Sequence, residues 1–128
     1  MGFLDTATEA APTIGAWLDM VGNGTGWVIT GKTVNSGATS STGTTYTCAL
    51  STWYSARLVV NSAATLVTFS VSNEAGTVLW TDTLATAIPV SATGTGFGIV
   101  GTDSSADAAT VLLSLDYLRL EIVRDLIR

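Results

Sequence analysis

The chain contains no histidine and only one cysteine, Cys48. Zinc sites in proteins draw most of their ligands from these two residue types, and a disulfide needs two cysteines, so a structural zinc site and an intrachain disulfide are both excluded. Nucleophilic triads lose their usual general base when histidine is missing, and no Gly-x-Ser-x-Gly sequence is present. We therefore expect no catalytic site, no metal and no cofactor, and we interpret Cys48 as a small apolar filler.

Charged residues are also scarce, at 12% of the 128 residues compared with about 25% in an average globular protein. Ten acidic and five basic side chains give a net charge of −5, and five basic residues are too few to line a groove that follows nucleic-acid phosphates. Threonine, serine, glycine and asparagine must therefore cover most of the surface. Such a neutral surface suits an extended assembly, because neighbouring copies meet without burying charges.

Long apolar runs are missing as well. Mean hydropathy is positive, but no apolar stretch approaches the ~20 residues that a membrane-spanning helix requires. The N-terminal segment MGFLDTATEAAPTIGAW has neither the basic region nor the continuous apolar region of a signal peptide. We expect a soluble protein that is made in the host cytoplasm and has no membrane partner.

Alternation of apolar and polar residues with a period close to two is the dominant pattern that the chain does have. Clusters of glycine, asparagine and serine interrupt this alternation at short intervals. Both features are typical of an all-β protein, and the length fits one domain, so we predict a single antiparallel β-sandwich. The expected strands are Ile14–Met20, Trp27–Val34, Thr44–Cys48, Tyr54–Asn61, Leu66–Ser72, Val78–Leu84, Gly96–Val100 and Thr110–Ile122.

Two turn sequences predict hairpins. The first, Asn23-Gly24, tolerates the positive φ that tight hairpin turns require, and it joins the first two expected strands. The second, Asn73–Gly76, has alternating strands on both sides and ends in glycine. The Ser/Thr/Gly-rich stretch Ser36–Thr45 is poorly specified and is interpreted as either a loop or an edge strand.

The chain ends fall outside the expected sandwich. Thr6–Ala11 has the composition of a helical turn, and Ile122–Arg128 fits either a short helix or a continuing strand. We therefore divide the chain into an N-terminal arm (1–13), a sandwich domain (14–122) and a C-terminal tail (123–128). Apolar terminal residues, which would need a partner if they were exposed, are Phe3, Leu4, Leu126 and Ile127.

One sequence matches a nucleotide-binding motif letter for letter. Gly26–Thr33 reads G-x-x-x-x-G-K-T, and Leu112–Asp116 resembles the apolar strand whose terminal Asp holds magnesium. A phosphate-binding loop also needs a strand before its first glycine, a flexible interior and a helix that begins at the lysine. A Gly-Asn turn precedes Gly26, and Trp-Val-Ile-Thr fills the interior. We therefore predict that Gly26–Thr33 is an ordinary strand.

Two further patterns are given structural interpretations. Gly94–Gly98 resembles the start of a dinucleotide fingerprint, but an expected strand follows it rather than a helix, so close backbone packing explains the glycines better. Asp103 and Asp107 lie in a Ser/Ala-rich stretch without the spacing of a calcium cage. We predict a solvated loop there.

Four tryptophans raise the possibility of carbohydrate binding, because exposed indole rings stack on the C–H faces of sugars. Trp27 and Trp53 stand where strands begin, and we predict that both lie in the core. Trp80 alternates with Val78 on one arm of its hairpin, and we predict that it faces outward. Trp17 is not assigned to either environment.

A resemblance to a known family rests on the order and spacing of several segments from about Ile14 to Ile122. The segments are Trp27-Val-Ile-Thr30, Thr52-Trp-Tyr-Ser-Ala-Arg57-Leu-Val-Val-Asn61, Thr68-Phe-Ser-Val-Ser72, Ala87-Ile-Pro89, Gly96-Phe-Gly-Ile-Val100 and Leu115-Asp-Tyr-Leu-Arg-Leu120. Together they resemble the concanavalin-like or laminin-G-like jelly-roll domains of tailed-bacteriophage structural proteins. The resemblance implies a jelly roll that is trimmed at its N-terminal part, with an open edge that neighbouring subunits cover. No sugar-binding or metal-binding residues of lectins match.

These observations predict a virion structural protein that is not an enzyme. The leading hypothesis is a capsid decoration or cement protein that sits on the capsid surface, contacts the major capsid protein and stabilises the head lattice. Its open edge and apolar termini predict a homo-oligomer, with a trimer as the expected state. The alternative is a carbohydrate-binding or host-recognition domain of a tail fibre or spike, with a glycan as ligand.

Overall fold

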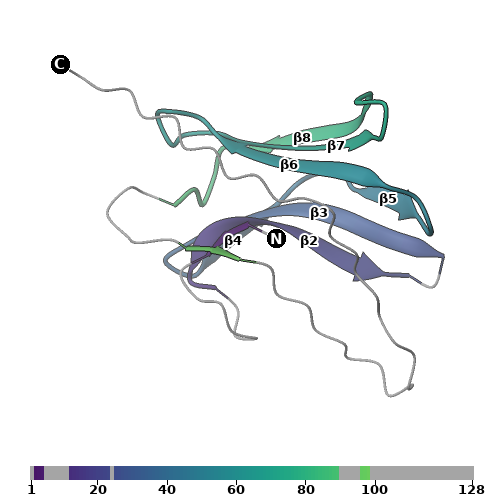
Figure 1. The fold of residues 1–128 in the computed structure, drawn as a ribbon. Coiled ribbons are helices and arrows are strands. Elements are labelled where there is room, and N and C mark those ends of the chain that lie inside the picture. The colour runs from purple at the N-terminus through teal and green to yellow at the C-terminus, as the bar shows by residue number, and fades with distance from the viewer. Residues whose placement is uncertain (1, 5–11, 24, 90–95, 99–128) are drawn as a thin grey trace.

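The computed structural model describes residues 2–4, 12–23, 25–89 and 96–98, and these residues form two antiparallel sheets that face each other (Figure 1). The described part contains no helix that is long and apolar enough to cross a membrane. The predicted all-β class and the antiparallel sandwich are confirmed. The jelly-roll connectivity stays a prediction.

Among the described residues, the larger sheet has six strands and the smaller sheet has three. The order in the larger sheet is β4-β3-β2-β1-β9, and β5 pairs with β3 on the same side as β4. Its strands are β1 (Gly2–Leu4), β2 (Ile14–Gly22), β3 (Gly26–Asn35), β4 (Ala38–Ser41), β5 (Tyr46–Ala49) and β9 (Gly96–Gly98). The smaller sheet, in the order β6-β7-β8, contains β6 (Tyr54–Val60), β7 (Val67–Asn73) and β8 (Val78–Leu84).

Most of the predicted strands and both hairpins are confirmed within a few residues. For the ambiguous stretch Ser36–Thr45, the edge-strand interpretation is correct over β4. The placement of Phe3 and Leu4 outside the sandwich was wrong, because β1 pairs with both β2 and β9 and is part of the larger sheet. A three-residue strand that is held by two neighbours carries no periodicity of its own for a sequence pattern to reveal.

Other predictions lie outside the described residues. These are the last expected strand over 110–122, the two terminal segments at 6–11 and 122–128, the acidic residues Asp103 and Asp107, and the segment Leu112–Asp116.

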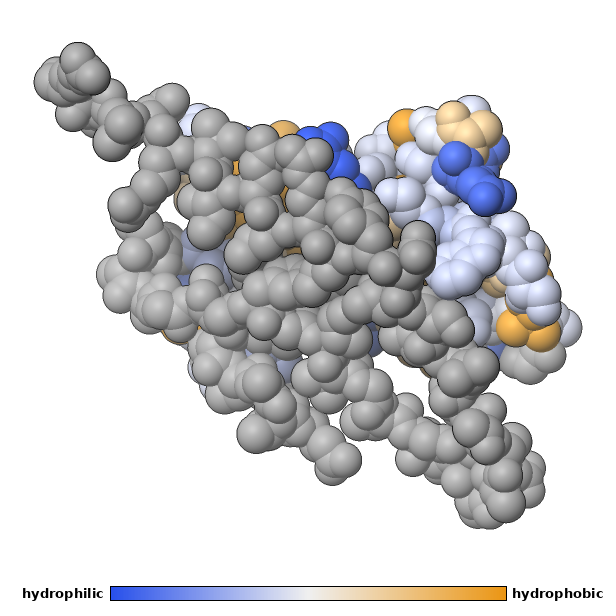
Figure 2. Space-filling model, viewed as in Figure 1, coloured by the Kyte–Doolittle hydropathy of each residue, from blue (hydrophilic) through white to orange (hydrophobic). Residues whose placement is uncertain are grey.

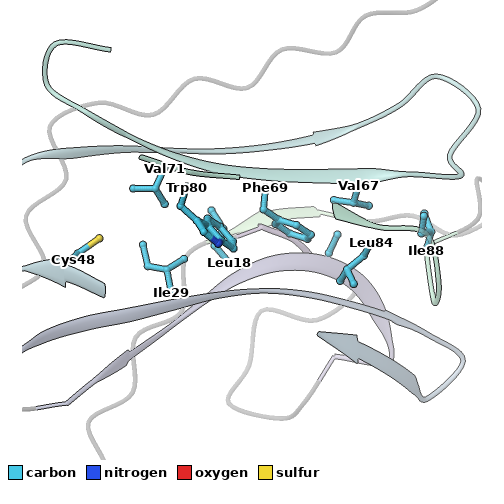
Figure 3. Packing of buried hydrophobic residues seen from close by; sticks show 10 residues of the cluster. Leu18, Ile29, Cys48, Val67, Phe69, Val71, Trp80, Leu84 and Ile88 are labelled. Carbon is cyan, nitrogen blue, oxygen red and sulfur yellow. The ribbon is translucent and has the colours of Figure 1, made fainter. Parts of the chain in front are cut away.

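The core lies between the two sheets (Figure 3). Phe69 on β7 is its largest fully buried side chain, and complete burial of such a ring contributes about 2–3 kcal/mol to the free energy of unfolding. The larger sheet contributes Leu18 and Ile29 opposite it. The remaining members of the core cluster are Ala16, Cys48, Val67, Val71, Trp80, Leu84 and Ile88. The interpretation of Cys48 as a buried filler is confirmed, since its side chain is only 6% exposed.

The segment that matches a phosphate-binding loop is a strand, as predicted. Residues 26–33 lie in β3, which pairs with β2 on one side and with β4 and β5 on the other. Its glycines have a packing role: a Cβ atom on Gly31 would stand 2.5 Å from the Phe69 ring, and one on Gly26 would overlap the carbonyl oxygen of Cys48. Lys32 forms an ion pair with Asp19 of β2 (2.6 Å).

A single hydroxyl group bridges the gap between β4 and β5 along the edge of β3. The Oγ1 of Thr42 accepts a hydrogen bond from the backbone N–H of Gly31 (3.2 Å) and donates one to the carbonyl of Thr44 (2.9 Å). The Thr42 N–H donates to the Gly31 carbonyl (2.9 Å). Thr42 is buried, so these bonds satisfy backbone groups that water does not reach.

The segment that follows β8 crosses back to the larger sheet and closes one end of the sandwich. The Thr33 hydroxyl donates to the carbonyl of Thr86 (2.8 Å), and the Asn35 side-chain amide donates to the carbonyl of Ile88 (3.1 Å). The Thr86 hydroxyl donates to the Ser40 hydroxyl on β4 (2.8 Å). These bonds hold Ile88 in place over the core, where it is 8% exposed.

Candidate binding site at the loop end of the sandwich

Two tryptophans occupy the reverse of their predicted environments. Trp80 is a core residue with 9% of its surface exposed, whereas Trp53 is 53% exposed. The prediction that Trp80 faces outward was wrong because of a β-bulge in β8: Val71 pairs with Trp80 but the next residue, Ser72, pairs with Val78. The extra residue puts Val78 and Trp80 on opposite faces although they are two positions apart.

The prediction of a core position for Trp53 was also wrong. Trp53 lies in the loop just before β6, one residue before the strand alternation begins at Tyr54. Trp27 is the second residue of β3, and its side chain packs against the core as predicted. Trp17 is partly buried and lies on the face of β2 opposite to Leu18.

Exposed apolar side chains gather at one end of the sandwich. Three loops meet there, because Gly26 of β3 pairs with the last residue of β5, and Tyr54, the first residue of β6, pairs with the last residue of β7. We call this the loop end (right side of Figures 1 and 2). Its exposed apolar residues are Val21, Leu50, Trp53, Val78 and Leu79.

A hollow of about 500 Å³ opens at the loop end between the β5–β6 loop and the β7–β8 turn. It is broad and open to solvent. Trp53 and Ala75 are the apolar residues that line it, and the polar ones are Thr52, Asn73 and Glu74. The hollow therefore combines one aromatic face with hydroxyl, amide and carboxylate groups.

Local hydrogen bonds fix the loop that carries Trp53. The backbone N–H of Ala49 donates to the hydroxyl oxygen of Tyr54 (3.1 Å), which ties the end of β5 to the start of β6. The Thr52 hydroxyl donates to the carbonyl of Leu50 (3.2 Å), and Ser51 takes a left-handed conformation with φ of 55°. The ring of Tyr54 also meets Tyr46 edge to face, with centroids 6.0 Å apart.

The opposite wall of the hollow is an equally ordered turn. The Asn73 side-chain oxygen Oδ1 accepts a hydrogen bond from the N–H of Thr77 (2.9 Å), while the Asn73 N–H donates to the Thr77 carbonyl (3.0 Å). Gly76 supplies the positive φ (81°) that the turn requires, and its N–H donates to the Asn73 carbonyl (2.9 Å). The turn does not use the Nδ2 group of Asn73 or the carboxylate of Glu74, so both remain for a ligand.

A second polar cluster links the two sheets. The Trp80 indole Nε1–H donates to the Thr44 hydroxyl (3.0 Å), which donates in turn to Oδ2 of Asp82 (2.7 Å). The N–H of Thr44 donates to the same oxygen (3.0 Å), and the N–H of Thr83 donates to Oδ1 (2.8 Å). The Thr44 hydroxyl is the main reason that the pKa of Asp82 lies below its ordinary value. Both carboxylate oxygens of Asp82 and the indole N–H of Trp80 have partners within the protein, which is typical of a structural contact.

The described residues offer no metal centre, since they contain no group of three or more His, Cys, Asp or Glu side chains. Within Gly94–Gly98, the structure describes only β9, where Gly96 and Gly98 pair with residues of β1. The hollow beside Trp53 is therefore the candidate functional site of the part that the structure describes. The sequence predicted an exposed tryptophan at Trp80, whereas the structure exposes Trp53.

A comparison with protein-family models finds one match, which covers residues 1–116. The matching family is described as SO2946-like, C-terminal domain. Searches among curated proteins and among solved structures find no match. The match covers most of the chain, including both sheets and the candidate site.

Proposed function

The chain belongs to the SO2946-like, C-terminal domain family, and we propose that it is a structural module of a bacteriophage particle that assembles through the outer face of its smaller sheet. The family is described as a C-terminal domain, which fits a module carried by a larger assembly. The proposed role is non-catalytic. The resemblance of the sequence to jelly-roll domains of phage structural proteins supports the proposal that the chain is part of a bacteriophage particle.

The observation that carries this proposal is the chemistry of that outer face. On β7, Val67, Phe69 and Val71 are buried, and the residues that alternate with them point away from the core. The strand register identifies the neighbours of these outward residues on β6 and β8. Six of the nine outward positions carry a hydroxyl group, two are valines and one is charged. We call these positions the hydroxyl face: Ser55, Arg57, Val59, Thr68, Ser70, Ser72, Val78, Thr81 and Thr83.

A face of this kind suits contact with a second copy of the chain. Each copy carries a net charge of −5, so two copies repel each other overall, but the hydroxyl face bears no acidic residue. Burying a hydroxyl group costs little free energy when it forms a hydrogen bond across the interface, whereas burying an unpaired carboxylate costs far more. We propose that copies of the chain meet through this face in a homotrimer that contacts the major capsid protein.

Sedimentation velocity at micromolar concentration tests the proposal. We expect a trimer for the wild-type protein and a shift to monomer for Ser70→Glu, which places a carboxylate at the centre of the hydroxyl face. Thr47→Glu is the matched control, because Thr47 is an exposed strand residue of the other sheet. A wild-type monomer that also fails to bind expanded capsids would contradict the proposal.

A second candidate is a host-recognition domain of a tail fibre or spike. The exposed position of Trp53 in an open hollow favours it, because an indole at the solvent boundary with polar neighbours is a typical ligand platform. Electron microscopy of labelled particles distinguishes the two locations: a head label supports decoration, and a tail label supports the fibre or spike.

A further inference from the structure

We propose that the hollow beside Trp53 binds a neutral saccharide, with the indole as stacking platform and Asn73 and Glu74 as hydrogen-bonding groups. The site lies on the loop end, away from the central residues of the hydroxyl face. The inference therefore holds for either location of the domain in a particle, and it does not depend on the proposed assembly.

Trp53 exposes a large aromatic surface at the loop end. An indole with 53% of its surface in water, at the end of a sandwich whose Trp80 is buried, leaves a large apolar face without a partner in the described structure. The C–H groups of a sugar ring are flat and weakly apolar, and they stack on such a face while the ring hydroxyls point outward to polar groups. A hollow of about 500 Å³ has room for a short oligosaccharide.

Polar groups suited to sugar hydroxyls line the hollow. The Asn73 Nδ2 group is a donor and the Glu74 carboxylate is an acceptor, and neither is used by the turn that holds them. A sugar hydroxyl donates and accepts at once, so this pair matches adjacent hydroxyl groups. The turn fixes the Asn73 side chain through its Oδ1 atom, which lowers the entropy lost when a ligand binds.

The negative charge of the protein selects among ligands that stack on aromatic rings. Nucleotides and sialylated glycans stack as well, but they are anionic. Glu74 is the charged residue that lines the hollow, and the whole chain carries a net charge of −5, so an anionic ligand is repelled. A neutral sugar avoids this repulsion.

The test is a glycan array that carries neutral hexose oligomers and sialylated oligomers, followed by NMR titration of the full chain with the best neutral binder. We expect binding to neutral glycans only, and shifts of the Trp53 indole N–H signal, which is assigned from its loss in Trp53→Phe. Trp53→Ala should weaken binding by about tenfold or more, while Trp53→Phe should retain part of it.

Controls separate a direct contact from a loss of fold. Leu50→Ala changes an exposed apolar residue of the same loop that does not line the hollow, so it should bind like the wild type. Glu74→Gln keeps a hydrogen-bonding group but removes the charge, so it should admit sialylated oligomers that the wild type rejects. An array without neutral binders, a preference for sialylated glycans, or unchanged affinity in Trp53→Ala would overturn the inference.

Discussion

Gly31 is part of a sequence motif, but its role in this structure is to pack against Phe69. Gly31 completes a phosphate-loop pattern in the sequence, yet its missing side chain makes room for the Phe69 ring between the sheets. The space is specific to glycine, since a Cβ atom would stand within 2.8 Å of three ring atoms. A motif of glycines is therefore informative only together with the secondary structure that surrounds it.

Gly31→Ala should destabilise the protein by about 1–3 kcal/mol, because the added methyl group forces the Phe69 ring to move within a packed core. Chemical denaturation measures this change. In a Phe69→Leu background the same substitution should cost less, since the smaller side chain leaves space. Equal costs in both backgrounds would show that the two residues do not compete for the same volume.

Asp82 makes the folding stability of the protein depend on pH. Its pKa lies below the ordinary value in the folded protein, mainly because the Thr44 hydroxyl donates to its carboxylate. Between the folded and the unfolded pKa of Asp82, the unfolded chain therefore binds more protons than the folded protein. The stabilising contribution of Asp82 is present above the unfolded pKa of about 3.9 and is lost as the pH falls through the folded pKa.

The melting temperature of Asp82→Asn should therefore lie furthest below that of the wild type at neutral pH. The difference should shrink as the pH falls below about 4, because protonation removes the charge that the wild type uses. Thermal denaturation from pH 7 to pH 2 measures it. A difference that stays constant over this range would contradict the assigned role of the carboxylate.

At the scale of the elements, alternation alone predicted most of the strands but not the two details that decide the candidate site. The pattern of Val67–Asn73 repeats without interruption, and β7 appears where it was expected. The bulge in β8 is a property of pairing with β7, so alternation within Val78–Leu84 gave Trp80 the wrong face. Trp53 belongs to a loop whose shape depends on Tyr54 and Ala49, and no period extends into it.

The junction between β4 and β5 depends on one hydroxyl group. Thr42→Val keeps the shape of the side chain but leaves the buried N–H of Gly31 without its acceptor and the Thr44 carbonyl without its donor. We expect a loss of about 2 kcal/mol in the free energy of unfolding. Thr39→Val, at an exposed position of β4, is the control and should change stability by less than about 0.5 kcal/mol. Equal effects of the two substitutions would contradict the bridging role.

At the scale of the whole molecule, the sequence predicted a sandwich but could not predict which of its surfaces are available. The low content of charged residues is visible in the composition. The concentration of hydroxyl groups on the outer face of β6, β7 and β8 becomes visible only once the strand register is known. The same holds for the loop end, where residues as distant in sequence as Val21 and Val78 reach one end through strand pairing within each sheet and the packing of the two sheets. The hydroxyl face and the hollow beside Trp53 share no residue, so assembly and ligand binding can be tested independently.

A cryo-electron microscopy map of the bacteriophage particle of which we propose this chain is a part tests the assembly role most directly. We expect several copies of the domain, with Trp53 facing the exterior. Ser70 and Thr81, at the centre of the hydroxyl face, should be buried against a neighbouring copy. A virion without this domain, or one in which Ser70 and Thr81 face solvent, would contradict the account.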